Sequence, residues 1–151
     1  MNKIFGLFIF SVVIFSSCTK EDTPPDPPVI QKTAEELLTA HPWKIQEIRY
    51  VHMDVLHHYQ RGGTPGDVEY LANESLQFNP NGTGITDNNA PLTWEFIDGA
   101  KTKLKFTINF TSGPVITNWE HIVLKENLLT YGEYWIRPSG PSVGFGTRIP
   151  K

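Results

Sequence analysis

Apolar and polar residues alternate along most of the chain after residue 42, in short segments that turn residues separate. The period of two is clearest in segment 104–110, whose apolar positions are Leu104, Phe106, Ile108 and Phe110. Successive side chains of a strand point to opposite faces, so these four residues share one face and the polar residues between them share the other. One apolar and one wet face are typical of an antiparallel sheet, whereas a buried parallel strand is apolar on both faces.

The same alternation predicts several more strands. They are expected at 43–53, 76–78, 83–86, 92–96, 115–125 and 128–136. Strands spaced about ten residues apart, without a second helical layer, indicate an all-β fold in which an antiparallel up-and-down meander closes into a small barrel. Closure is favoured because it leaves no exposed edge strand. A β-sandwich is the alternative.

Local signals refine this picture. The apolar positions change phase around Gln46 and Glu47, which predicts a β-bulge in the first strand. Pro80 presets φ and Gly82 accepts a positive φ, as a tight turn between two strands requires. The Gly- and Pro-rich tail from Arg137 is predicted to be irregular, with one short strand at most.

A short N-terminal helix is predicted before the first strand. Thr33 and Glu36 fit a capping box, in which each side chain accepts a hydrogen bond from the backbone of the other residue. Leu37 and Leu38 follow as the apolar face, and Pro42 ends the helix after one or two turns.

The start of the chain resembles a bacterial lipoprotein signal. Lys3 supplies a positive charge, segment 4–15 is apolar and uncharged, and two serines precede Cys18, the only cysteine. In a lipobox the cysteine is acylated and becomes the first residue of the mature protein. We therefore predict a signal peptide at 1–17 and lipid attachment at Cys18.

Two other interpretations fit this segment less well. As a helix, segment 4–15 spans about 18 Å, and it falls short of the roughly 20 residues that a membrane crossing needs. An ordinary secretory signal would leave Cys18 without a disulfide partner in an oxidising compartment.

Residues 18–32 are predicted to form a lipid-anchored tether, because segment 23–28 is rich in proline and should be extended. Lys20 followed by two acidic residues also resembles the surface-export signal of lipoproteins of the Bacteroidetes, although charges are common in any solvated tether. We expect anchoring in the outer membrane of a cell envelope, with periplasmic and surface-exposed orientations both open. Residues 33–151 are predicted to be one domain.

Charge and cysteine content narrow the possible partners. The chain carries 13 Lys and Arg against 16 Asp and Glu, a formal net charge of −3. Nucleic acid is therefore not expected as a partner, because the chain has no basic stripe to neutralise phosphates. A single cysteine forms no intrachain disulfide, so the core must stabilise the domain.

No motif predicts catalysis, a cofactor or a metal. The chain has no Gly-x-Ser-x-Gly elbow, and the Gly-rich segment 62–66 lacks the Lys-Ser/Thr end of a Walker loop. His52, His57 and His58 could ligate zinc, but adjacent strand residues point to opposite faces, so His57 and His58 cannot reach one ion. We expect a protein that is not an enzyme.

Several short motifs together resemble a family. They are Trp43 at the start of the first strand, Leu76-x-Phe78-x-Pro80-x-Gly82-Thr83, Trp94-x-Phe96, Ile122-x-Leu124 and Leu129-x-Tyr131. Over residues 33–136 this pattern is similar to that of the small lipocalin-like lipoproteins of the Bacteroidetes. The resemblance implies a barrel able to hold a small ligand. It also implies that Trp43 is a structural plug at one barrel end, with an arginine across its ring, for which Arg137 is the first choice and Arg148 the second.

The size of the inward residues bears on whether such a barrel is hollow. Many are bulky, which predicts an interior filled by side chains; a shallow cavity at one rim is the alternative. Segment 52–61 is the predicted rim, because function tends to lie on loops that a rigid scaffold holds. The candidate ligand-binding residues are His52, His57, His58, Tyr59, Arg61 and Trp119.

The expected function is that of a lipid-anchored envelope protein with a non-catalytic barrel that binds a small apolar ligand at one rim. The alternative is a surface module with a filled core that contacts a protein or glycan through exposed aromatic residues, for which Tyr59, Trp119 and Trp135 are candidates. A weak hydrolase would need carboxylates or histidines clustered at the mouth.

Overall fold

The structure is a computed structural model, and it describes residues 31–64, 68–137 and 140–151. The predicted signal peptide, Cys18 and most of the predicted tether lie outside these residues. The elements are α1 (Ala34–Thr39), β1 (Trp43–His52), β2 (Val55–Gln60), the 3-10 helix η1 (Glu69–Asn73), β3 (Ser75–Phe78), β4 (Thr83–Thr86), β5 (Pro91–Phe96), β6 (Leu104–Phe110), β7 (Gly113–Lys125), β8 (Leu128–Arg137) and β9 (Gly140–Pro150). Among the described residues, no helix is both long and apolar enough to cross a membrane.

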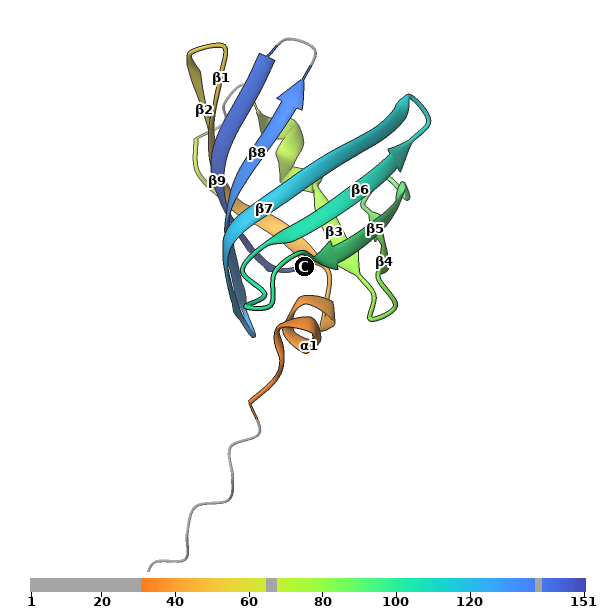
Figure 1. The fold of residues 1–151 in the computed structure, drawn as a ribbon. Coiled ribbons are helices and arrows are strands. Elements are labelled where there is room, and N and C mark those ends of the chain that lie inside the picture. Colours follow the sequence, from red (N-terminus) through yellow and green to blue (C-terminus); the bar gives the residue numbers. More distant parts are fainter. Residues whose placement is uncertain (1–30, 65–67, 138–139) are drawn as a thin grey trace, which may run out of the picture. The chain divides into compact units, whose positions relative to one another are not determined.

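The strands form one antiparallel sheet that closes on itself (Figure 1). From β3 to β9 each strand pairs with the next in sequence, and β1 pairs with β3 on one edge and with β9 on the other. β2 folds back on β1 as a hairpin outside the closed ring of eight strands. The predicted fold class, an up-and-down meander closing into a small barrel with a short N-terminal helix, is confirmed.

Helix α1 covers one end of the barrel, which we call the closed end (Figure 1). The predicted capping box is present, since Thr33 and Glu36 accept hydrogen bonds from each other's backbone N–H. Leu38 is buried in the barrel core, and Trp43 Nε1 donates to the Leu38 carbonyl oxygen over 2.8 Å. The helix is therefore fixed to the first strand by both packing and a buried hydrogen bond.

The closed end is filled by aromatic side chains. Phe78 is the centre of this cluster, and its ring meets those of Trp94, Phe106 and Trp119 edge-on at centroid distances of 5.9 to 6.0 Å. Trp119 also stacks on Tyr131 at 4.0 Å. Each such side chain contributes about 1.5 to 3 kcal/mol by burial, and edge-on pairs add to that.

Two bulges set which side chains enter this core. The register of β1 against β9 shifts between Ile45 and Glu47, where the sequence predicts a bulge. A second shift lies in β7 between Glu120 and Val123, and His121 there has a φ of 53°. Because one extra residue reverses the alternation, Trp119 before this bulge and Ile122 after it both point inward. The prediction that Trp119 is exposed is therefore wrong.

The predicted irregular tail is instead strand β9, which closes the barrel between β8 and β1. Its inward positions include Gly144, Gly146 and Arg148, so no apolar alternation marks the strand in the sequence. A Cβ on Gly146 would lie 2.4 Å from the ring of Tyr131, so only glycine leaves room for that buried tyrosine. Segment 55–60, predicted as rim, is also a strand, β2.

Candidate ligand-binding cavity

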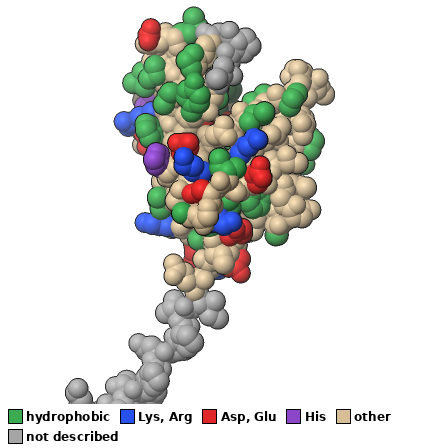
Figure 2. Space-filling model, in the orientation of Figure 1, with side chains coloured by type: hydrophobic (Ala, Val, Ile, Leu, Met, Phe, Trp, Pro, Cys, Tyr) green, Lys and Arg blue, Asp and Glu red, His purple; other side chains and the backbone are tan. Residues whose placement is uncertain are grey.

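The barrel wall separates at the end opposite α1, which we call the open end. In the described part of the chain, β7 pairs with β8 only from Asn118 and Tyr134 toward the closed end. Toward the open end, β7 continues with β6 as far as Gly113, and β8 continues with β9 as far as Arg137. Figure 1 shows these two strand pairs diverging at the top, and Figure 2 shows the surface hollowed between them.

Pairing also changes on the other side of the barrel. β1 pairs with β3 only at Trp43 and Lys44, and on that edge its part from Glu47 to His52 pairs with β2. Helix η1 packs at this junction, and Leu71 joins Ile48 and Tyr50 in a second buried cluster. The open end is thus bounded by η1 on one side and by the divergence of β7 and β8 on the other.

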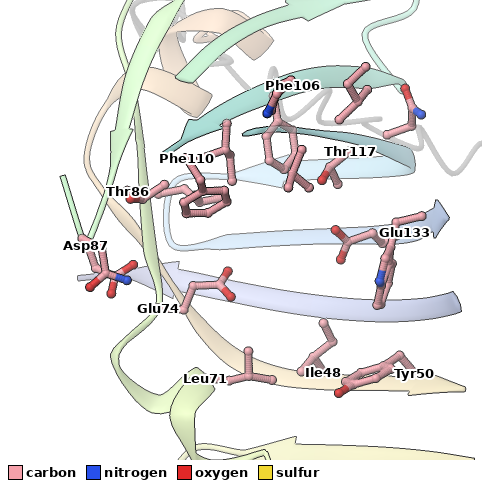
Figure 3. A pocket seen from close by; sticks show the side chains of 18 of the residues that line it. Ile48, Tyr50, Leu71, Glu74, Thr86, Asp87, Phe106, Phe110, Thr117 and Glu133 are labelled. Atoms are coloured by element: carbon pink, nitrogen blue, oxygen red, sulfur yellow. The ribbon is translucent and has the colours of Figure 1, made fainter. Parts of the chain in front are cut away.

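Between these elements lies a cavity of about 930 Å³. Its apolar lining includes Ile48 and Tyr50 on β1, Phe106 and Phe110 on β6, and Trp135 on β8. Figure 3 shows the two phenylalanines on one side of the cavity and Ile48, Tyr50 and Leu71 on the other. The predicted filled interior therefore holds for the closed end but is wrong for the open end.

A buried arginine forms the polar floor of this cavity. The Arg148 side chain donates from Nε to Tyr131 Oη over 3.1 Å, from Nη1 to the Trp43 carbonyl oxygen over 3.5 Å, and from Nη2 to a carboxylate oxygen of Glu74. Its guanidinium carbon lies 5.3 Å from the ring centroid of Trp119. These contacts join the aromatic core below to the cavity above.

Burial and charge act together on this floor. Burial raises the pKa of the Tyr131 phenol, so Tyr131 stays neutral at physiological pH. Burial alone would lower the pKa of Arg148, but the negative charge that Tyr131 gains when it ionises at high pH and the carboxylates of Glu74 and Glu133 outweigh it and raise that pKa. Arg148 is therefore a fixed positive charge that its neighbours compensate.

Three carboxylates line the cavity, and that of Glu74 is paired with this arginine. Glu74 follows η1, Asp87 follows β4, and Glu133 lies on β8. Figure 3 shows the carboxylate groups of Glu74 and Glu133 pointing into the space between the aromatic and aliphatic walls. The cavity thus combines aromatic and aliphatic walls with polar and charged groups, as ligand sites do.

None of the six predicted ligand-binding residues is among the described residues that line the cavity. Nδ1 of His52 lies 2.7 Å from Ser142 Oγ, and His57 stacks on the cavity residue Tyr50 at 4.7 Å. His58 is on the opposite face of β2, with Nε2 3.0 Å from a carboxylate oxygen of Glu47. The described histidines and acidic residues form no group of three that could hold a metal ion.

The other three candidate residues make contacts that stabilise the fold. Tyr59 is buried against Ile48 in the second cluster, so it is not the exposed aromatic residue that the sequence predicts. Arg61 donates to the carbonyl oxygens of Ile45 and Ala72, each over 2.8 Å. Trp119 is fully buried at the closed end.

The predicted plug consists of Trp43 and an arginine across its ring. Trp43 is fully buried beside α1, and His41 packs edge-on against it at 4.2 Å. The side chain of Arg137 lies outside the described part, so its stacking on Trp43 stays a prediction. The second choice, Arg148, bonds the backbone of Trp43 but lies over the rings of Trp119 and Tyr131.

Sequence reasoning did not predict the charged residues that line the cavity. Glu133 had a usable signal, because it lies two positions after Tyr131 on the same strand face, which was predicted inward. Glu74 had no such signal in the sequence, because the 3-10 helix before it produces no periodic pattern of apolar residues. Arg148 lies in β9, where glycines at inward positions remove the apolar alternation that predicts a strand.

A second surface feature lies on the outside of the barrel. Leu56, Val51, Val143 and Tyr134 are successive register partners across β2, β1, β9 and β8. With Phe145 they form an outer apolar face on which each side chain is 44 to 68% exposed. Figure 2 shows hydrophobic side chains gathered over the upper part of these strands.

Comparison with known proteins adds no assignment. No protein-family model matches the chain, and neither a curated protein nor a solved structure matches it. Function must therefore be argued from the cavity and the surface themselves.

Proposed function

We propose that this chain is a lipid-anchored envelope protein whose lipocalin-like barrel binds a small ligand at its open end. The observation that carries the proposal is the cavity of about 930 Å³, which falls within the roughly 300 to 1,000 Å³ of small-molecule sites. Its aromatic and aliphatic walls suit an apolar ligand body, and its charged floor can orient one polar group.

Binding without catalysis is proposed because the two buried residues of the floor, Tyr131 and Arg148, are not suited to proton transfer near neutral pH. Tyr131 is held neutral, and Arg148 is held charged and hydrogen-bonded to Tyr131 and Glu74. A general acid or base works best when its pKa is near the working pH. Both groups are shifted away from it.

The cavity is tested by filling it. Ile108 lines the cavity, whereas the next residue, Asn109, is exposed on the outer face of β6. We expect Ile108→Trp to weaken binding of the neutral fluorophore N-phenyl-1-naphthylamine by about tenfold or more, because the indole occupies the ligand's space. Asn109→Trp is the matched control and should bind the fluorophore as the wild type does. Equal binding by both folded variants would contradict the proposal.

The anchor is tested separately. The lipobox resemblance places the acyl chains on Cys18. We expect labelled fatty acid to enter the wild-type protein in bacterial cells and to be absent from Cys18→Ala. Label in the Cys18→Ala variant would show that the lipid is not attached at Cys18 and would contradict the predicted anchor.

The outer apolar face supports a second candidate, a protein-contact module. Contiguous exposed apolar patches often mark interaction surfaces. The simplest partner to test is a second copy of the chain. Sedimentation should then show concentration-dependent association that Val143→Lys abolishes, and a wild type that stays monomeric at high concentration would exclude self-contact through this face.

A further inference from the structure

A second hollow lies on the outer side of the barrel, over β1, β9 and β8. It is a groove of about 320 Å³, and it shares no described lining residue with the cavity. We propose that this groove binds a neutral saccharide. The proposal goes beyond ligand binding at the open end and does not depend on it. The residues on which it rests are Glu47, Arg49, His121, Thr130, Gly132, Phe145 and Thr147.

The groove exists because one strand position has no side chain. Gly132 lies between its register partners Phe145 on β9 and Glu120 on β7, and the bulge at His121 borders the same gap. A Cβ on Gly132 would lie 3.5 Å from the Phe145 ring, which is an ordinary contact. Unlike Gly146, this glycine is therefore not required by the packing. Glycine within a strand often marks a place where a ligand approaches the backbone closely.

Phe145 supplies an aromatic surface beside this gap. Aromatic side chains often cover a glycine of a neighbouring strand, and that structural role accounts for the contact of Phe145 with Gly132. The side chain is nevertheless 68% exposed, more than any other large apolar side chain in the described part of the chain. The face of an aromatic ring is electrostatically negative, so the weakly positive C–H groups of a sugar ring pack well on it.

The charges of the groove indicate a neutral ligand. Apart from the imidazole of His121, the described lining carries one acidic and one basic side chain, Glu47 and Arg49. They pair with each other, with Arg49 Nη2 2.8 Å from a carboxylate oxygen of Glu47. Nε2 of His58 lies 3.0 Å from the same oxygen. A charged ligand would have to compete with these contacts, whereas a neutral ligand leaves them in place.

The polar groups match hydroxyl groups in particular. Thr147 is the register partner of both Glu47 and Thr130, so these three residues lie side by side on the groove wall. The Arg49 guanidinium only donates hydrogen bonds, the carboxylate only accepts them, and threonine hydroxyls do both. A sugar hydroxyl also donates and accepts, so it can bond to each of these groups. Polar groups of this kind beside an aromatic ring indicate a saccharide.

Isothermal titration of the full chain with oligosaccharides tests the ligand class. The neutral probes are cellohexaose, laminarihexaose, maltohexaose and xylohexaose, and hexagalacturonate is the charged counterpart. We expect at least one neutral probe to bind with a Kd below about 1 mM, and hexagalacturonate to bind more weakly than that probe. If no neutral probe binds, the proposal is overturned. Tighter binding of hexagalacturonate than of every neutral probe would overturn the assignment of a neutral ligand.

Variants locate the bound saccharide. Phe145→Ala removes the aromatic surface, and Gly132→Thr fills the gap with a side chain that suits a strand. We expect each to weaken binding of the neutral probe by about tenfold or more. Tyr70→Ala is the control, because Tyr70 is an aromatic residue of similar exposure, 63%, that lies outside the groove. It should bind the probe as the wild type does.

The outcomes separate this proposal from ligand binding in the cavity. Phe145 and Gly132 do not line the cavity, so both variants should bind N-phenyl-1-naphthylamine as the wild type does. If Tyr70→Ala weakens saccharide binding and Phe145→Ala does not, the saccharide binds at the open end and the groove is excluded. Wild-type saccharide affinity in both groove variants would exclude the groove as well.

Discussion

The two ends of the barrel differ although the same strands build both. Along β6 the inward positions pass from Leu104, which is fully buried, through Phe106 to Phe110, which is 39% exposed. Along β8 they pass from buried Tyr131 to the cavity residues Glu133 and Trp135. Alternation is unbroken in both strands, so the change from core to cavity comes from the neighbouring strands.

Strand pairing explains the difference. At the closed end each strand has partners on both edges, and α1 covers the interior. At the open end β7 and β8 separate beyond Asn118 and Tyr134, so the walls no longer meet over the inward side chains. We therefore expect stability to be concentrated at the closed end, and the open end is where we propose that a ligand binds.

The largest effect is expected from one substitution at each end. Phe78→Ala removes the centre of the closed-end cluster and should lower the free energy of unfolding by about 3 to 5 kcal/mol. Phe110→Ala should cost less than about 1 kcal/mol, because the side chain is partly exposed and leaves no closed void. Urea unfolding of both variants measures the contrast. Similar losses would show that the two ends are equally packed.

The features of the closed end that could be predicted are local ones. The capping box, the start of β1 at Trp43 and the bulge beyond Ile45 each follow from a few adjacent residues. The bulge at His121 could not be predicted, because it depends on how β7 meets β8. Without this bulge, the alternation along β7 wrongly predicts that Trp119 points outward.

The cavity was missed for a similar reason. Residue volumes along single strands predicted a filled interior, but cavity volume depends on where strands diverge. The separation of β7 from β8 and the partner change of β1 from β3 to β2 are relations between distant segments. Glu74 and Arg148 come from two such segments and meet only in the folded barrel.

Arg148 lies where the two ends of the barrel meet, and removing its charge tests its role there. Arg148→Met leaves Glu74 and the Tyr131 hydroxyl without their buried donor, and we expect it to destabilise the protein by about 3 kcal/mol. Part of this loss should be recovered when Glu74→Gln is added, because the unpaired carboxylate is then gone. Thermal or urea unfolding measures both variants.

An exposed ion pair supplies the control for this experiment. Arg49 lies on the outer face, with Nη2 2.8 Å from a carboxylate oxygen of Glu47. Arg49→Met should change the free energy of unfolding by less than about 1 kcal/mol, as exposed pairs contribute little. If Arg148→Met is no more destabilising than Arg49→Met, the buried arginine does not link the core to the cavity floor.

The smallest effect is expected at a turn that supports the closed end. After β5, the Asp98 carboxylate accepts hydrogen bonds from the Thr102 hydroxyl and from the N–H groups of Thr102 and Lys103, and next to this turn Lys101 forms an ion pair with Glu35 of α1. The Thr102 hydroxyl, followed by these N–H groups and the Lys103 charge, holds the pKa of Asp98 below its ordinary value. A lowered pKa stabilises the fold above the pKa of the unfolded chain, about 3.9, and this contribution is lost as pH falls through the folded-state pKa.

Thr102→Val removes the strongest of these hydrogen bonds and leaves the backbone donors in place. We expect the pKa of Asp98, followed by NMR titration of its carboxyl carbon, to rise toward the ordinary aspartate value without reaching it. Thr93→Val is the control, since Thr93 is an exposed residue of β5 remote from this carboxylate in the turn. An Asp98 pKa that is the same in Thr102→Val as in the wild type would mean that the turn is not held by this hydroxyl. The acid sensitivity of the closed end would then have another origin, such as the Glu35–Lys101 pair, in which the hydrogen bond from Lys101 also lowers the pKa of Glu35.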